Sequence, residues 1–169
     1  KLVIAALNGH TVGGGLEIAM AADLRLARHG GGRIGLPEVN LGVLPGTGGT
    51  QRLARLVGKA KSIELMVTGD LIDFEEAADL GIVNQVIEAD SHEAFMEKVV
   101  EYAERFTTPG TASMAVGLIK RSVQTGIELP FESALAVERE LQAQLFASHD
   151  AKEGIAAYVE KRTAEFKGS

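Results

Sequence analysis

The sequence predicts an α/β fold in which short strands and a helix form the first part and helices form the last part. Two observations support this prediction. Apolar runs of strand length lie near the amino end, and from about Thr50 onward the apolar residues recur at helical spacing. The glycine content and the net charge also change near residue 50. Residues 1–50 hold 12 of the 20 glycines and carry a net charge of +1, whereas the remainder carries −7.

The first part has the pattern strand, helix, strand. An apolar run at residues 2–7 predicts a buried strand, and a stretch rich in small residues predicts a helix from about Gly14 to Ala22. A second apolar run at residues 24–27, in which Leu24 and Leu26 alternate with other residues, predicts the next strand.

The middle of the chain contains three expected helices and one strand. Gly58 and Gly69 each follow an apolar-periodic segment, as glycine does when it ends a helix. Asp73, with Glu76 three residues later, resembles a capping box that opens the third helix. An apolar run at residues 82–87 predicts the strand that follows.

Four amphipathic helices should follow the last strand. Their expected starts, each marked by a capping residue or proline, are Asp90 with Glu93, Thr108-Pro109, Pro130, and Asp150 with Glu153. Their apolar stripes must pack on the core or on a sister subunit.

The most unusual local sequence is the glycine triplet Gly13–Gly15, which directly precedes the predicted helix. Glycines remove the side chains that would keep a ligand away from the backbone. The free N–H groups and the dipole of a helix amino end favour an anionic oxygen there. The alternative is that the triplet only allows the helix to pack tightly against a strand.

Several kinds of site are disfavoured. There is no cysteine, and neither glycine cluster has the lysine of a phosphate-binding loop or the spacing of a dinucleotide fingerprint. No serine lies in a nucleophile-elbow motif, and the four histidines lack metal-ligand spacing. Only His10 is placed to line a cleft, and we expect no metal ion. The acidic net charge of −6 and the lack of tryptophan argue against nucleic acid as a partner, and no apolar run is long enough to span a membrane.

Two carboxylates are the best candidates for acid–base chemistry. Glu17 lies in the first turn of the predicted helix, and Glu38 follows Pro37 at a second strand–turn junction. Singly, each could be a helix-dipole or cap residue. Together, they could share one water molecule as acid and base. The second glycine cluster, residues 45–53, is better explained by a tight turn with an ordinary cap.

Four segments in order resemble the enoyl-CoA hydratase (crotonase) family: VIAALNGHTVGGGLEIAMAADLRLA, GLPEVNLGVLPGTGGTQRLARLVG, ELMVTGDLIDFEEAADLGIVNQV and LFASHDAKEGIAAYVEKRTAEFKG. The resemblance implies a crotonase-like spiral of ββα units in residues 1–88. It also implies a helical region in residues 89–169 through which the protein forms a homo-oligomer, a trimer or dimer of trimers.

The resemblance also implies roles for single residues. Gly14 would donate an oxyanion-hole N–H to the thioester oxygen of an acyl-CoA, and Glu17 and Glu38 match the family's two catalytic glutamates. Gly46 would lie beside the reacting water. A larger set would touch the substrate: Gly13, Gly46, His10, Tyr158 and Lys161.

The expected reaction is hydration of a 2-enoyl-CoA to a 3-hydroxyacyl-CoA in fatty acid β-oxidation, with no cofactor beyond the CoA of the substrate. Isomerisation or hydrolysis of an acyl-CoA, and a non-catalytic assembly module, are the alternatives. We expect a cytoplasmic protein. Lys1 stands where an initiator methionine would, and a strand-like run follows at once with nothing before it to pair with, so we expect a missing amino-terminal portion. The resemblance implies that this portion holds the family's other oxyanion donor.

Overall fold

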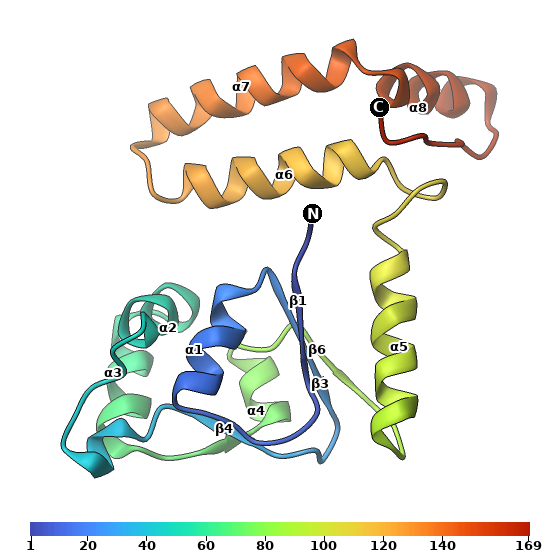
Figure 1. Ribbon diagram of the computed structural model, residues 1–169. Helices are drawn as coiled ribbons and strands as arrows, with labels where there is room; N and C mark the ends of the chain where they lie inside the picture. Colours follow the sequence, from blue (N-terminus) through green and yellow to red (C-terminus); the bar gives the residue numbers. More distant parts are fainter. The chain divides into compact units, whose positions relative to one another are not determined.

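A computed structural model describes residues 1–169, which form two compact units. One unit is Val3–Val100, and the other is Glu101–Ser169 together with Lys1 and Leu2. The elements of both are labelled in Figure 1. The domain boundary predicted between residues 88 and 89 stays a prediction. None of the helices combines the length and the apolar character needed to cross a bilayer.

The first unit contains two small three-stranded sheets. Their strands are β1 (Ile4–Leu7), β2 (Thr11–Val12), β3 (Leu24–Arg28), β4 (Arg33–Gly35), β5 (Ile72–Asp73) and β6 (Gln85–Ile87). One sheet has the order β1-β3-β6 and is parallel, with Ile4 opposite Leu24 and Leu26 opposite Gln85. The other has the order β2-β4-β5, in which β2 and β4 are parallel and β4 and β5 antiparallel.

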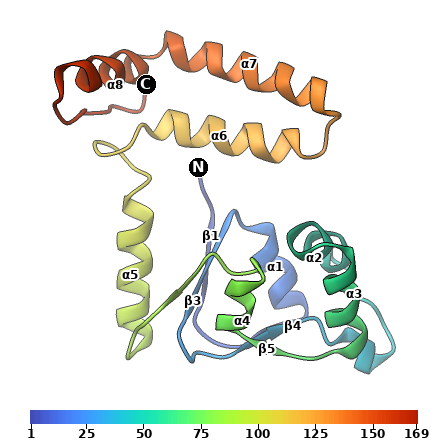
Figure 2. The same ribbon diagram turned by 180° about the vertical axis from the view of Figure 1, so that it is seen from behind.

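Helices connect and cover these strands, as Figure 2 shows from behind. They are α1 (Gly14–Ala21), the 3₁₀ helix η1 (Glu38–Leu41), α2 (Gly49–Val57), α3 (Lys59–Thr68) and α4 (Phe74–Asp79). Helix α5 (His92–Glu104) follows β6 and contains the boundary between the two units. The strand–helix–strand prediction for the first part is confirmed, with α1 one residue shorter than expected. The N-cap at Asp73 is confirmed as well, because its carboxylate accepts the Glu76 N–H at 2.8 Å.

The core of this unit lies among both sheets and helices α1, α2 and α4. Its apolar members come from all of these elements: Leu7, Leu16, Ala19, Met20, Ala27, Ile34, Leu36, Leu53, Ile72, Phe74, Ala77, Ile82 and Val83. Helix α1 is anchored in this core through Leu16, Ala19 and Met20, so its amino end is held by a rigid support.

The strand predicted at residues 82–87 is shorter than the apolar run suggested, since β6 begins only at Gln85. The preceding residues form a turn that binds the buried Arg25. Its guanidinium donates to the Ile82 carbonyl at 2.6 Å, and its backbone N–H donates to Asn84 Oδ1 at 2.8 Å. The Ile82 side chain is buried in the core. Its backbone carbonyl binds the Arg25 guanidinium and is not part of a strand.

Gly32, in the β3–β4 connection, lies so close to another backbone segment that a side chain there would collide with it. A methyl group on Gly32 would lie 2.5 Å from the His10 nitrogen and 2.7 Å from the Gly9 carbonyl carbon. We expect Gly32→Ala to lower the free energy of unfolding by about 1–3 kcal/mol, since backbone atoms must move. Chemical denaturation measures this loss. Gly9→Ala is the matched control, because a methyl group there meets nothing within 4 Å; equal stability of the two variants would contradict the expectation.

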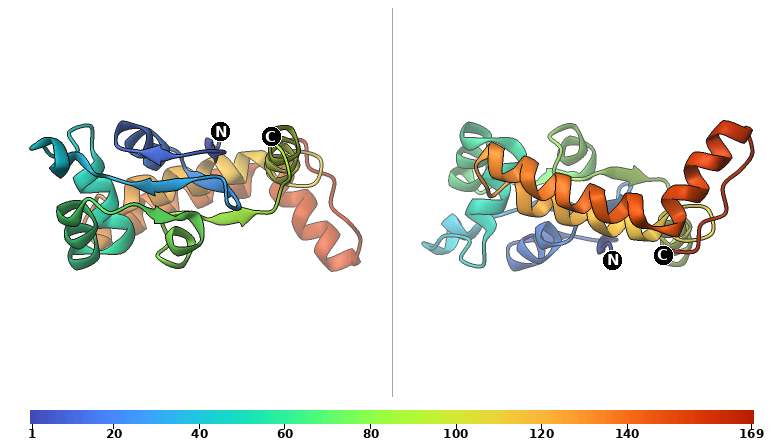
Figure 3. Two further views of the ribbon diagram at one scale, coloured as in Figure 1. Left: turned by 90° about the horizontal axis from the view of Figure 1, so that it is seen from below. Right: turned by 90° about the horizontal axis from the view of Figure 1, so that it is seen from above.

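The second unit is helical. Helices α6 (Ser113–Gly126) and α7 (Phe131–Ala147) run side by side in opposite directions, and α8 (His149–Glu160) follows α7 (Figures 1 and 3). The start at Pro130 is confirmed, since this residue is the N-cap of α7. Apolar side chains of α6 and α7, among them Ile119, Val123 and Phe131, are exposed in the single chain.

The other three predicted helix starts are displaced. Helix α6 begins at Ser113 and not at Thr108-Pro109, because the Pro109 carbonyl accepts the Phe166 N–H of the chain end at 3.0 Å. Helix α8 is capped by Ser148, whose hydroxyl accepts the Ala151 N–H at 3.0 Å. The start at Asp90 is also displaced, since Ser91 accepts the Ala94 N–H at the beginning of α5.

Asp150, expected to be a cap, instead holds the carboxyl-terminal segment. Its buried carboxylate accepts the N–H groups of Lys167 and Gly168, both at 2.8 Å. One turn later, Glu153 accepts two hydrogen bonds from Arg162, at 2.6 and 2.9 Å, and the Glu165 N–H at 3.0 Å. Two carboxylates of α8 thus fasten the last residues of the chain.

This arrangement makes stability dependent on pH. The hydrogen bonds from Arg162 and then from the Glu165 backbone lower the pKa of Glu153 from 4.5 to about 2. The unfolded chain then takes up this proton at higher pH than the folded chain does, so the stabilisation is complete above pH 4.5 and is lost as the pH falls toward 2. We expect Glu153→Gln to reduce the acid-induced fall in Tm by a few degrees. Thermal unfolding at pH 7 and pH 3 measures this, and Glu132→Gln, an exposed residue of α7, should behave as wild type.

Candidate active site

The Glu17 carboxylate lies at the amino end of a different helix from its own. Glu17 belongs to α1 and is only 5% exposed. Its Oε1 accepts the backbone N–H groups of Thr47 and Gly49, both at 2.7 Å. Its Oε2 accepts the Thr47 hydroxyl. Although Glu17 is placed to serve the dipole of α1, its carboxylate binds the start of α2.

The glycine-rich turn before α2 is shaped to receive this carboxylate. Gly48, the N-cap, has φ 104 and no side chain to bind the free N–H groups of the helix. A methyl group on Gly49 would lie 2.7 Å from Pro45 Cβ and 2.9 Å from Glu17 Oε1. The turn therefore requires glycine where the carboxylate approaches, and Glu17 caps α2 from outside.

These contacts keep Glu17 ionised. Burial alone raises the pKa of a carboxyl group, but the Thr47 hydroxyl, the Gly49 and Thr47 N–H groups and the charge of Arg52 together outweigh it. The pKa of Glu17 lies below its usual value as a result. Glu17 is thus a buried anion at neutral pH.

The Glu38 carboxylate has a contrasting environment. Glu38 is the first residue of η1 and is half-buried. Its Oε1 faces the glycine triplet, where a methyl group on Gly13 would lie 3.1 Å away. Its Oε2 is buried and accepts no hydrogen bond in the chain. An unpaired buried carboxylate oxygen is costly, so this atom needs a partner such as water, substrate or its own proton.

The glycine triplet presents a free amide at the start of α1. The Gly13 N–H donates to the Gly35 carbonyl at 2.9 Å, and the Gly13 carbonyl accepts the N–H groups of Leu16 and Glu17. The N–H of Gly14, the first residue of α1, donates to no acceptor in the chain, and Gly14 is exposed. Gly13 has φ 58, a left-handed conformation that glycine takes without strain.

The remaining candidate residues differ in their placement. Gly46 is exposed and directly precedes Thr47. His10 is exposed, and its Nδ1 accepts the Arg33 N–H at 3.1 Å, so it is joined to β4 and contacts neither glutamate. Tyr158 and Lys161 belong to the other unit, at the end of α8, where both are exposed.

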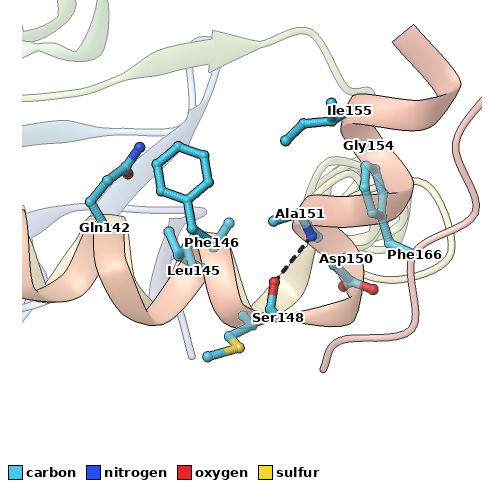
Figure 4. A pocket seen from close by; sticks show the side chains of 12 residues that line it. Gln142, Leu145, Phe146, Ser148, Asp150, Ala151, Gly154, Ile155 and Phe166 are labelled. Atoms are coloured by element: carbon cyan, nitrogen blue, oxygen red, sulfur yellow. Dashed lines mark hydrogen bonds between the residues drawn. The ribbon is translucent and has the colours of Figure 1, made fainter. Parts of the chain in front are cut away.

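A separate hollow of about 320 Å³ lies within the second unit, among α6, α7, α8 and the chain end (Figure 4). Its walls are mostly apolar and include Phe146, Ile155 and Phe166. Two polar residues in its wall are engaged in folding: Ser148 caps α8, and Asp150 binds the chain end. The hollow therefore offers no free acid–base group.

A family model for enoyl-CoA hydratase/isomerase matches residues 1–169, the whole chain. The chain belongs to the enoyl-CoA hydratase/isomerase family. Among its curated relatives, a crotonyl-CoA hydratase of Syntrophomonas wolfei is 41% identical over 166 residues, which cover 98% of this chain and 62% of the relative. A short-chain-enoyl-CoA hydratase of Clostridium acetobutylicum is also 41% identical, over 98% of this chain and 61% of the relative.

Solved structures confirm the crotonase-like α/β fold of this family member. A crystal structure of an enoyl-CoA hydratase from Geobacillus kaustophilus matches with a TM-score of 0.91 and 48% identity, over 98% of this chain and 61% of that one. An enoyl-CoA hydratase from Bacillus anthracis matches with a TM-score of 0.90 and 37% identity. The chain spans about three fifths of the length of these relatives.

Thr47 and Gly49 bind the Glu17 carboxylate, and the sequence did not single them out. The glycine cluster at residues 45–53 was interpreted as a turn with an ordinary cap, but its cap is the carboxylate of Glu17, 30 residues earlier. The sequence does contain a feature that could have indicated this contact. Helix α2 is strongly amphipathic, yet it starts after Gly48, which has no side chain to cap it. Such a helix needs an acceptor from elsewhere in the fold. No group of three or more carboxylate or histidine side chains is arranged to hold a metal ion.

Proposed function

We propose that the protein hydrates a 2-enoyl-CoA to a 3-hydroxyacyl-CoA. The observation that carries the proposal is the contrast between two carboxylates: that of Glu38, which faces Gly13, and that of Glu17, which belongs to the helix beginning at Gly14 and binds the start of α2. Glu17 is an anion that accepts three hydrogen bonds, whereas Glu38 has a buried oxygen without a partner. Addition of water across a double bond requires one group that accepts a proton from water and one that donates a proton to carbon. The names of the relatives, crotonyl-CoA hydratase and short-chain-enoyl-CoA hydratase, agree.

The free N–H of Gly14 is proposed to bind the thioester oxygen. Attack on C3 moves negative charge through the conjugated system onto this oxygen, so a donor fixed there lowers the barrier. The amino end of α1 adds its partial positive charge. The core contacts of Leu16 and Met20 hold the helix, and so the donor, in place.

The two glutamates are proposed to divide the proton transfers. Ionised Glu17 accepts a proton from water as the water oxygen bonds to C3. Protonated Glu38 donates its proton to C2, and the electron pair of the double bond passes through the enolate to form the new C2–H bond. Proton exchange with solvent then returns Glu17 to its ionised form and Glu38 to its protonated form. The low pKa of Glu17 supports this order of roles.

The substrate contacts and the assembly also belong to the proposal. Gly13, Gly46 and His10 would lie along the substrate, and Tyr158 and Lys161 would approach the CoA bound to a neighbouring or the same subunit. The protein would form homotrimers or dimers of trimers and act in the cytoplasm in β-oxidation, with no cofactor beyond the CoA of the substrate. Exposed apolar residues of α6 and α7 would supply the subunit contact.

Crotonyl-CoA tests the proposed reaction directly. The full natural polypeptide should remove the ultraviolet absorbance of the conjugated thioester and form 3-hydroxybutyryl-CoA, identified by mass spectrometry as a gain of one water. Migration of the double bond or release of free CoA without hydration would overturn the proposal in favour of isomerisation or hydrolysis. Trimers that bind no acyl-CoA in calorimetry would support an assembly module instead.

A further inference from the structure

We propose that Thr47 is a positioning residue: its hydroxyl holds the Glu17 carboxylate so that a single acceptor site stays open to the reacting water. This inference rests on the proposed hydration. It concerns a side chain, whereas the other two contacts of Glu17 come from the backbone.

The acceptor sites of Glu17 can be counted. A carboxylate offers about four lone-pair sites, two on each oxygen. The Thr47 and Gly49 N–H groups occupy both sites of Oε1. The Thr47 hydroxyl occupies one site of Oε2. One site of Oε2 remains, and the position of the hydroxyl decides where that site points.

The environment indicates that the hydroxyl donates to Glu17 and does not accept from it. A hydroxyl can do either, since a protonated carboxyl could donate to it. Two N–H donors already face Oε1, and the amino end of α2 and the charge of Arg52 lie nearby. All of these favour the ionised carboxylate, which has no proton to give.

The main chain at Thr47 is held on both sides. Its N–H binds Glu17, and its carbonyl accepts a hydrogen bond from Arg52 at 3.4 Å. The Arg52 side chain folds closely over Gly48, where a methyl group would lie 1.9 Å from the guanidinium. The hydroxyl therefore extends from a backbone that is fixed independently of it, and removing the hydroxyl should leave the turn in place.

Three variants of the full natural polypeptide test the inference. Thr47→Val removes the hydroxyl at nearly constant volume, and Thr47→Ser keeps it. Thr50→Val is the matched control from the first turn of α2, because the Thr50 hydroxyl accepts a hydrogen bond from the Gln51 side chain and is not bonded to Glu17. The readouts are kcat and kcat/KM for crotonyl-CoA as functions of pH, and the titration of the Glu17 carboxyl carbon by NMR.

Loss of a hydrogen bond to a charged group should lower kcat of Thr47→Val about 10- to 100-fold. The acid limb of its kcat/KM profile should move to higher pH, together with the pKa of Glu17 in the NMR titration. Thr47→Ser should restore both, and Thr50→Val should match wild type.

An acid limb that stays in place in Thr47→Val would overturn the inference. Movement to lower pH would overturn it too, because the hydroxyl would then accept from a neutral Glu17. These failures differ from failure of the proposed function, in which the wild-type protein hydrates no crotonyl-CoA. The NMR titration needs no activity and decides the hydroxyl's role in that case as well.

Discussion

Glu17→Gln should lower the rate of crotonyl-CoA hydration by about 10²- to 10⁴-fold, the contribution of a positioned general base. Glutamine has nearly the same shape, and its carbonyl can accept the Thr47 and Gly49 N–H groups that Oε1 accepts in the wild type. Its amide can donate to the Thr47 hydroxyl. The fold should persist, whereas the negative charge that we propose takes the proton from water is lost.

Glu38→Gln should lower the rate by a similar factor for a different reason. An amide does not release a proton to C2, and Glu38 has no hydrogen bond at Oε2 whose loss would disturb folding. Initial rates for both variants, with circular dichroism as the test of folding, measure the effect. Glu97→Gln, an exposed residue of α5, is the control. Near wild-type rates in either active-site variant would remove that glutamate from the mechanism.

The second large effect is expected at Gly14, where a backbone donor can be deleted. Gly14→Pro removes the N–H, and proline is tolerated at the first position of a helix. Gly13 is not helical, with ψ −129, and has no Cβ to collide with a following proline ring. Loss of one oxyanion donor costs about 3–4 kcal/mol, so kcat should fall about 10²- to 10³-fold.

Gly14→Ala tests whether a loss of activity in Gly14→Pro comes from the missing N–H or from the added side-chain atoms. It keeps the N–H, and its methyl group meets nothing within 4 Å. We expect it to retain much more activity than Gly14→Pro, with both variants folded by circular dichroism. Equal kcat values for Gly14→Pro and wild type would show that this amide does not bind the developing oxyanion.

Much of the site's local structure follows from short stretches of sequence. The start of α1 at Gly14 and the cap at Asp73 were predicted correctly, because each depends on residues within one helical turn. Strands β2, β4 and β5 were not predicted. Each has only two or three residues, which is too short to show a period.

The amino-acid sequence alone specified the family, the first strand–helix–strand unit and the two candidate glutamates, since these reside in contiguous motifs. The folded chain decided which partner each carboxylate found: Glu17 binds the start of α2, and Asp150 binds the chain end instead of capping its helix. Local spacing cannot reveal such pairs, because a buried carboxylate takes whichever free N–H groups the packing of distant segments brings to it.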